Sequence, residues 1–240
     1  MLVLVTGGTG YLGRELVRRG CVGASLSTGL DVRDADAVRH LLTQLQPAVV
    51  IHTANVQHGP EAWSTNVDGS RTVARATRRL RLIHLSTDIV FDGTKGRPYV
   101  EDDPLCPATE YGRSKAAAEA AVTESHPEAL IVRTSLLYGG LEPSAHELAA
   151  RDPTMTFYTD EIRCPVLVGE LADRLLGLAE ADLIGPLHLV GADAVSRHQF
   201  ASLLARHQVR GGLRPPDRPS DCRLTSTKVE PLLGVRDVLG

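Results

Sequence analysis

The sequence of 240 residues lacks several features that mark particular classes of protein. No apolar run approaches the roughly 20 residues that a membrane-spanning helix needs, so we expect no membrane protein. The net charge is only −3, from 26 basic and 29 acidic residues, so neither nucleic acid nor an anionic membrane is an expected partner. The apolar start, residues 1–5, is too short and uncharged for a signal peptide, and we expect a cytoplasmic protein.

Cysteines are few and scattered. The four lie far apart in the sequence, at positions 21, 106, 164 and 222. Their spacing does not match that of metal-ligand motifs, so we interpret them as reduced thiols and expect no metal site. Hydrophobic residues make up 42% of the chain, enough for one large domain or for a domain with a small lobe.

Short apolar runs alternate with helical stretches along the first part of the chain. Strands are predicted at residues 2–5, 48–52, 82–86 and 130–133, and helices at residues 12–19, 65–80 and 111–124. Apolar strands that do not alternate with polar residues, and that are separated by helices, are typical of a parallel sheet covered on both faces. The pattern predicts an α/β fold with a Rossmann-type doubly wound parallel sheet.

A glycine-rich segment directly follows the first predicted strand and opens the first predicted helix. Gly7, Gly10 and Gly13 have the spacing of a dinucleotide-binding loop in the required context. Gly7 permits a tight turn, Gly10 lets the backbone approach a diphosphate, and Gly13 lets the helix pack closely on the strand. The diphosphate would lie at the helix N-terminus, where N–H groups and the helix dipole favour negative charge. A plain glycine turn is the alternative.

NAD sites usually end their second strand with an acidic residue that holds the adenosine ribose, but residues 21–29, the corresponding region here, contain no acidic residue. Ser27, Thr28 and Arg14 could bind a 2′-phosphate instead, although Arg14 fits a solvated helix face equally well. We therefore expect NADPH as the cofactor, with NADH as the alternative. Asp31 and Val32 would border the adenine, although a turn or helix cap explains Asp31 nearly as well.

The pattern becomes less regular after residue 138. Proline and glycine recur there, and residues 211–220 have the composition of a loop. We predict an NAD(P)-binding Rossmann domain over residues 1–138 and a smaller substrate-binding lobe over residues 139–240. Residues 165–180 are expected to return to the first domain.

Tyr111 and Lys115 lie four residues apart in a predicted helix, so their side chains share one face. A tyrosine alone has a pKa near 10, and a neighbouring ammonium group favours the phenolate and lowers that pKa. Thr87 follows a predicted strand, at the carboxyl edge of the sheet where such folds bind ligands. Its hydroxyl can hold a substrate carbonyl while Tyr111 donates a proton. An ordinary helix with an exposed tyrosine and lysine is the alternative.

Two longer segments of sequence indicate a particular protein family. Residues 86–93 read Ser-Thr-Asp-x-Val-Phe-x-Gly, and residues 218–224 read Arg-Pro-x-x-x-Arg-Leu. With the glycine loop and the Tyr/Lys pair, they make the chain resemble the extended short-chain dehydrogenases/reductases. Within that group it is most similar to the dTDP-4-dehydrorhamnose reductase family, over nearly its whole length.

The resemblance implies a full set of site residues. It makes Thr87, Tyr111 and Lys115 the catalytic residues. The expected substrate-binding residues are Asp88, Ile89, Leu136 and Arg223. Together with the glycine loop and its neighbours, the expected cofactor contacts are Gly7, Thr9, Gly10, Tyr11, Leu12, Gly13, Arg14, Ser27, Asp31, Val32, Thr53, Ala54, Asn55, Ser86, Tyr111, Lys115, Thr134 and Leu136.

Two positions depart from the family pattern. Ile89 stands where the family usually has an aromatic residue, and Leu136 stands where it usually has tryptophan. Only 4% of the chain is aromatic, and the second lobe is shorter than is usual in the family. Because sugar rings are often held against aromatic faces, these departures favour an apolar pocket.

The resemblance implies an NAD(P)H-dependent reductase of a ketone, foremost of a dTDP-4-keto-6-deoxy sugar. Ile89 and Leu136 favour an alternative, the reduction of a non-sugar carbonyl of secondary metabolism. An epimerase or dehydratase fits less well, because Ile89 rather than a second acid follows Asp88. A regulatory subunit that binds NADP without catalysis is a further alternative, against which the intact trio argues. The expected partner is a small-molecule substrate, and the resemblance suggests a homodimer.

Overall fold

A six-stranded sheet is the central element of the computed structural model, which describes residues 1–240. The strand order is β10-β5-β4-β3-β1-β2, and the neighbours among β2, β1, β3 and β4 pair in parallel. The predicted Rossmann-type α/β fold is therefore confirmed. The strands of this sheet are β1 (Val3–Thr6), β2 (Val22–Ala24), β3 (Val49–His52), β4 (Arg81–Thr87), β5 (Leu130–Thr134) and β10 (Gly185–His188).

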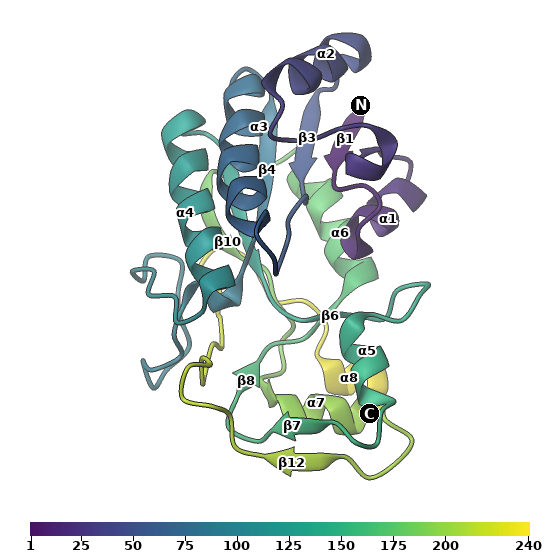
Figure 1. The fold of residues 1–240 in the computed structure, drawn as a ribbon, viewed down its shortest axis with the longest axis vertical. Helices are drawn as coiled ribbons and strands as arrows, with labels where there is room; N and C mark the ends of the chain where they lie inside the picture. The colour runs from purple at the N-terminus through teal and green to yellow at the C-terminus, as the bar shows by residue number, and fades with distance from the viewer. The chain divides into compact units, whose positions relative to one another are not determined.

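Helices cover both faces of this sheet (Figure 1). Helices α2, α3 and α4 lie on one side of strands β1, β3 and β4, and helices α1 and α6 lie on the other. This is the doubly wound arrangement that alternating strands and helices predict. The helices are α1 (Tyr11–Arg18), α2 (Ala35–Leu45), α3 (Ser70–Ala76), α4 (Glu110–Ser125) and α6 (Val168–Leu178).

An apolar core fills the space between the sheet and the first group of helices. Its members include one buried residue from each of four neighbouring strands: Leu4, Val50, Leu82 and Ile131. Side chains alternate between the faces of a strand, so residues two positions further on point to the same side. On β1, β3 and β4 those residues are Thr6, His52 and His84, all of them buried. The core therefore changes from apolar to polar toward the carboxyl ends of the strands.

The chain divides into two compact units. Unit 1 comprises residues 1–86, 113–132 and 172–186, and unit 2 comprises residues 87–112, 133–171 and 187–240. The predicted boundary at residue 138, between cofactor-binding and substrate-binding parts, stays a prediction. Unit 2 contains smaller elements: β6 (Leu137–Tyr138), α5 (Ala145–Ala150), β7 (Thr156–Tyr158), β8 (Ile162–Arg163), β9 (Val166–Leu167), β11 (Val195–Ser196), α7 (Arg197–Leu204), β12 (Arg210–Gly212) and α8 (Val235–Leu239).

Three short helical segments complete the chain, and one of them alters a predicted helix. The helix predicted at residues 65–80 begins as the π-helical segment η2 (Ser64–Gly69) and continues as α3. Within η2, the buried Asn66 side chain bonds both the N–H and the C=O of Val56, each at 2.8 Å. This anchors the loop that follows β3. The other segments are η1 (Leu26–Thr28) and η3 (Asp88–Val90).

Residues 165–180 add no strand to the six-stranded sheet, although residues 172–180 belong to unit 1. Strand β9 pairs with β6, and helix α6 follows it directly. The reason is the apolar spacing of α6, in which Val168, Leu171, Leu175 and Leu178 are buried at helical intervals. The additional strand of the sheet is instead β10, which follows α6.

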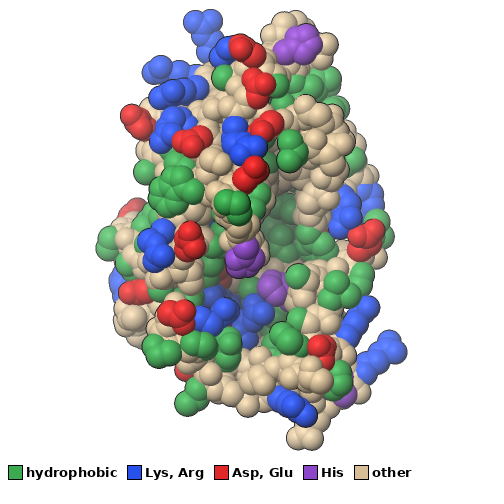
Figure 2. Space-filling model, viewed as in Figure 1, with side chains coloured by type: hydrophobic (Ala, Val, Ile, Leu, Met, Phe, Trp, Pro, Cys, Tyr) green, Lys and Arg blue, Asp and Glu red, His purple; other side chains and the backbone are tan.

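The visible surface carries charges of both signs (Figure 2). Acidic and basic side chains occur close to one another on that face, in keeping with the net charge of −3. None of the helices combines the length and the apolar character needed to cross a membrane.

Two glycines allow helix α1 to approach the end of β1 closely. Gly7 has a φ of +78°, a left-handed conformation that favours glycine. A Cβ on Gly13 would lie 2.1 Å from the carbonyl oxygen of Gly7. The predicted functions of these two glycines in the turn and in the packing are consistent with this geometry.

We expect Gly13→Ala to lower the free energy of unfolding by about 2 kcal/mol or more, since its methyl group would overlap a backbone oxygen. Gly177 in α6 is a matched control, because a Cβ there would meet no atom within 4 Å. Gly177→Ala should raise stability by about 0.5 kcal/mol, through helix propensity. Urea denaturation measures both changes, and equal effects of the two variants would contradict the packing argument.

Candidate active site

The glycine loop connects strand β1 to helix α1 and is hydrogen-bonded to the end of β2. The N–H groups of Gly7 and Gly8 both donate to the Ala24 carbonyl at the end of β2, at 2.8 and 3.1 Å. Gly10 is the N-cap residue of α1 and provides no side-chain acceptor for the first turn of the helix. The backbone N–H groups of that turn therefore face no capping side chain, as a diphosphate-binding helix start requires.

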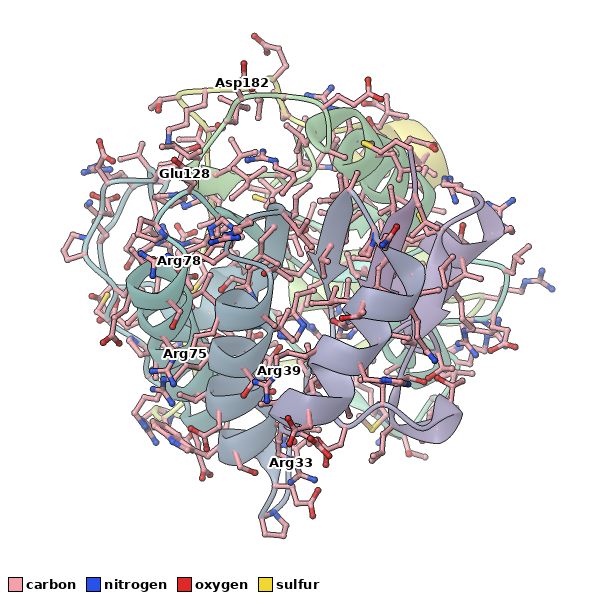
Figure 3. The ribbon with its side chains drawn as sticks, turned by 90° about the horizontal axis from the view of Figure 1, so that it is seen from above. Arg33, Arg39, Arg75, Arg78, Glu128 and Asp182 are labelled. Atoms are coloured by element: carbon pink, nitrogen blue, oxygen red, sulfur yellow. The ribbon has the colours of Figure 1, made fainter.

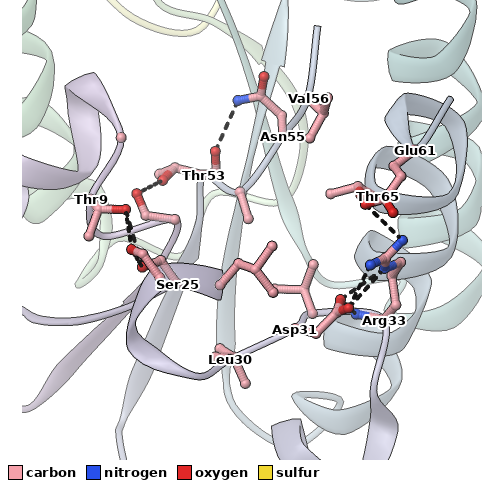
Figure 4. A pocket seen from close by; sticks show the side chains of 16 residues that line it. Thr9, Ser25, Leu30, Asp31, Arg33, Thr53, Asn55, Val56, Glu61 and Thr65 are labelled. Atoms are coloured by element: carbon pink, nitrogen blue, oxygen red, sulfur yellow. Dashed lines mark hydrogen bonds and ion pairs between the residues drawn. The ribbon is translucent and has the colours of Figure 1, made fainter. Parts of the chain in front are cut away.

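A pocket of about 520 Å³ lies beside this loop, within unit 1 (Figure 4). It brings together nine of the residues that we predicted as cofactor contacts: Gly7, Thr9, Gly10, Ser27, Asp31, Val32, Thr53, Ala54 and Asn55. Seven further residues line it that the sequence did not reveal: Ser25, Leu26, Leu30, Arg33, Val56, Glu61 and Thr65.

One wall of the pocket carries a cluster of three hydroxyl groups. The Oγ1 atom of Thr9 lies 3.2 Å from the Oγ of Ser25 and 3.3 Å from the Oγ of Ser27, and the two serine oxygens are 3.0 Å apart. No acidic side chain takes part in this cluster. Hydroxyl groups can donate to phosphate oxygens and, unlike a carboxylate, do not repel them. The cluster therefore suits a phosphate-bearing ribose.

The opposite wall is charged (Figure 4). Arg33 Nη2 lies 2.7 Å from Asp31 Oδ2, and Arg33 Nη1 lies 3.3 Å from Glu61 Oε2. The hydrogen bonds from Arg33 lower the pKa of Asp31, which keeps that carboxylate ionised. Arg33 lies two residues after Asp31, and this proximity in the sequence could have indicated that Arg33 lines the pocket. Glu61 lies in a different loop, and its position depends on the fold.

Several predicted cofactor contacts do not line this pocket. On helix α1, Leu12 and Gly13 are buried and Arg14 is exposed. The hydroxyl of Ser86 donates to the buried Glu119 carboxylate at 2.5 Å. The others outside the pocket are Tyr11 and Lys115 in unit 1, and Tyr111, Thr134 and Leu136 in unit 2.

Helix α4 carries both Tyr111 and Lys115, one turn apart on one face. The Lys115 side chain is buried and donates from Nζ to the Leu85 carbonyl at 2.6 Å. Burial lowers the pKa of Lys115 to about 8, although the nearby Glu119 carboxylate opposes this shift. Thr87 is the last residue of β4, and its Oγ1 accepts from the Ile89 N–H at 3.4 Å.

The start of helix α4 packs closely on the segment after β4. A Cβ on Gly112 would lie 2.2 Å from the Ile89 carbonyl oxygen, so only glycine permits this approach. The pKa of the neighbouring Tyr111 is raised, first by burial and then by the negative charge of Asp88. Our expectation of a lowered pKa was therefore wrong for this arrangement, because desolvation and a like charge both disfavour the phenolate.

The predicted substrate residues all belong to unit 2. Asp88 is buried, accepts from the Ser135 hydroxyl at 2.5 Å and lies 3.3 Å from the Arg163 guanidinium. Arg223 is paired with Asp221, with an Nη2 to Oδ2 distance of 2.6 Å.

The other predicted substrate residues are apolar. Leu136 packs beside a buried cluster that includes Tyr138 and Phe200, whereas Ile89 lies half-buried in η3. Asp88 is thus the only one of the four predicted substrate residues that is fully buried.

A second hollow of about 330 Å³ lies elsewhere on unit 1, lined by Arg75, Arg78, Glu124 and Ser125 (Figure 3). It adjoins the C-terminal ends of α3 and α4, where the helix dipoles are negative and basic side chains are favourable. Its arginines are thus explained by the helix ends. Nowhere in the chain are three or more His, Cys, Asp or Glu side chains grouped to hold a metal ion.

A family model supports a common origin for nearly the whole chain. The model described as the RmlD substrate binding domain matches residues 1–234. A protein of Streptomyces griseus named dTDP-4-dehydrorhamnose reductase is 41% identical over 201 residues, which cover 76% of this chain and 66% of that protein. A probable dTDP-4,6-dihydroxy-2-methyloxan-3-one 4-ketoreductase of Streptomyces antibioticus is 34% identical, with 85% and 76% covered.

Solved structures show the same fold. A dTDP-4-dehydrorhamnose reductase of Bacillus anthracis in complex with NADP superimposes with a TM-score of 0.88, at 24% identity, covering 100% of this chain and 98% of that one. A hypothetical dTDP-4-dehydrorhamnose reductase of Sulfolobus tokodaii superimposes with a TM-score of 0.80, at 26% identity, covering 93% and 92%.

We expect Ser27→Asp to weaken binding of NADPH by about tenfold or more, since roughly 1.4 kcal/mol of repulsion corresponds to a factor of ten. The new carboxylate would lie in the hydroxyl cluster, where we expect the 2′-phosphate. NADH lacks this phosphate and should bind at least as well as it does to the unaltered chain. Fluorescence titration with each cofactor measures the two affinities, and an equal loss for both would contradict this assignment.

Proposed function

This chain belongs to the family described as the RmlD substrate binding domain, and we propose that it is an NADPH-dependent ketone reductase. The proposed substrate is a dTDP-4-keto-6-deoxy sugar, as the names of the two Streptomyces relatives suggest. The observation that carries the proposal is helix α4, which presents Tyr111 and Lys115 one turn apart and packs through Gly112 on Ile89, in the segment after β4.

The residues around the glycine loop fit the cofactor. Gly7 and Gly13 let helix α1 pack closely on the end of β1, and α1 begins without a capping side chain. In our proposal the N-terminus of α1 holds the diphosphate, and the hydroxyl groups of Thr9, Ser25 and Ser27 hold the 2′-phosphate. When bound, NADPH supplies the hydride that reduces the carbonyl carbon.

Tyr111 donates the proton to the carbonyl oxygen in this proposal. Its raised pKa keeps the phenol protonated before the reaction, which is the state that a reductase requires. The Lys115 ammonium, one turn further along the helix, stabilises the phenolate that forms. Thr87 would hold the carbonyl oxygen, since its hydroxyl stands at the carboxyl edge of β4.

The substrate-binding residues are proposed with the same substrate in mind. Asp88 and Arg223 would contact or support the sugar nucleotide, and Ile89 and Leu136 would line the remaining surface. A homodimer and a cytoplasmic location also stay predictions, which rest on the resemblance and on the composition.

We expect Tyr111→Phe to reduce turnover by about 10²- to 10⁴-fold, the usual contribution of a general acid, while NADPH still binds. Tyr138→Phe is a matched control, because the Tyr138 hydroxyl is buried without a hydrogen-bond partner and belongs to another cluster. The control should keep its activity. Full turnover of the Tyr111 variant, measured by NADPH oxidation, would remove Tyr111 from the proposed mechanism.

A non-sugar ketone is the second candidate substrate, favoured by Ile89 and Leu136 in place of aromatic residues. Calorimetric titration with a dTDP-4-keto-6-deoxy sugar separates the two candidates. We expect a micromolar dissociation constant if the sugar nucleotide is the substrate. Absence of binding at millimolar concentration, with NADPH binding intact, would favour the non-sugar ketone.

A further inference from the structure

Two buried histidines lie side by side beneath helix α4. His52 on β3 and His84 on β4 are register partners in the parallel sheet, and their ring centroids are 5.2 Å apart. Both side chains are almost completely inaccessible to solvent. Buried polar groups nearly always have hydrogen-bond partners, so the partners of each ring nitrogen carry information.

The two rings differ in their partners. His52 is fully engaged, with Nδ1 2.6 Å from the Thr6 hydroxyl and Nε2 3.0 Å from the Ser70 hydroxyl. His84 has a single partner, since its Nε2 lies 3.5 Å from Lys115 Nζ and its Nδ1 has none. His52 is thus explained by the local packing, whereas the one hydrogen bond of His84 is to the lysine of the proposed catalytic trio.

The donor in this contact fixes the tautomer of His84. An ammonium group has three N–H donors and no lone pair, so Nε2 of His84 must accept. The ring proton therefore resides on Nδ1. A second proton on His84 would place two positive charges 3.5 Å apart in a buried site. Burial and the Lys115 charge accordingly hold the pKa of His84 well below its usual value.

The hydrogen bonds of the Lys115 ammonium group can also be counted. Its Nζ donates to the Leu85 carbonyl at 2.6 Å and to His84 at 3.5 Å, which accounts for two of its three N–H bonds. The charged or titratable groups around it are His52 from β3, His84 from β4 and, on its own helix, Glu119 and Tyr111. Among the groups from the two strands, only His84 accepts a hydrogen bond from the ammonium through its side chain.

We propose that His84 is a positioning residue, whose lone pair, together with the Leu85 carbonyl, orients the Lys115 ammonium and leaves its third N–H for the cofactor ribose. This inference rests on the proposed function of Lys115. It also implies that His84 helps to keep Lys115 charged, because a hydrogen-bond acceptor stabilises a buried ammonium group.

The test compares His84→Leu, which removes the acceptor, with His84→Gln, whose side-chain oxygen can accept where Nε2 does. We expect His84→Leu to lower the pKa of Lys115 by about one unit, the order expected for one lost hydrogen bond to a charged group. The alkaline limb of the kcat profile should move to lower pH by the same amount. His84→Gln should retain both values within about 0.3 unit, an effect corresponding to a twofold change in the equilibrium.

The chain is well suited to a direct measurement, because it has only three lysines: Lys95, Lys115 and Lys228. Carbon-13 labelling of the lysine side chains gives three NMR titrations, and Lys115→Arg identifies the relevant one. This readout requires neither substrate nor turnover. Absence of reductase activity would therefore reject the proposed function while the titration still tests the contact between His84 and Lys115.

A matched control is His126→Leu, which also removes a buried histidine with one hydrogen bond, to the Leu80 carbonyl at 2.9 Å. His126 follows Lys115 by eleven residues, which is about 16 Å along a helix. This variant should leave the Lys115 titration unchanged. The inference fails if His84→Leu leaves the titration unchanged as well, or if a folded His84→Gln shifts it as far as His84→Leu does.

Discussion

The burial of one positive charge, the Lys115 ammonium, constrains the arrangement of helix α4 and strand β4. A buried ammonium group is costly unless polar atoms surround it. Here the Leu85 carbonyl accepts from it, and the Glu119 carboxylate lies one turn along the same helix. The Leu85 carbonyl belongs to β4, so it can accept from Lys115 only if α4 lies tightly on β4. The packing that stabilises the charge therefore also fixes the helix that carries Tyr111.

Neighbouring contacts reinforce this packing. The side-chain amide of Asn66 donates to the Ser114 hydroxyl at 2.9 Å, which ties η2 to α4. The hydroxyl of Ser86 donates to Glu119 from β4. These polar groups concentrate at the carboxyl ends of the strands, while the amino ends carry Leu4 and its apolar neighbours. Natural proteins tolerate such local conflicts with core packing mainly at functional sites.

The parts of the structure that follow from short stretches of sequence could be predicted, and those that depend on distant residues could not. A strand, three glycines and a helix are adjacent in the chain, so the sequence indicated the turn at Gly7 and the close packing at Gly13. Strand β10 lacks a strand pattern and contains Pro186; it forms because it meets β5, where the Gly185 N–H donates to the Ala129 carbonyl. The ion pair of Arg33 with Glu61 likewise joins two loops.

Tyr111 shows how burial, together with a distant residue, can reverse a prediction made from the sequence. Lys115 was expected to lower its pKa, but burial and Asp88 raise it. Asp88 is itself held by Ser135 and Arg163, so the charge that acts on the phenol depends on contacts within unit 2. If the substrate reaches Asp88, as we propose, its binding would alter these contacts. The Asp88 carboxylate would then influence both the acidity of Tyr111 and the recognition of the substrate.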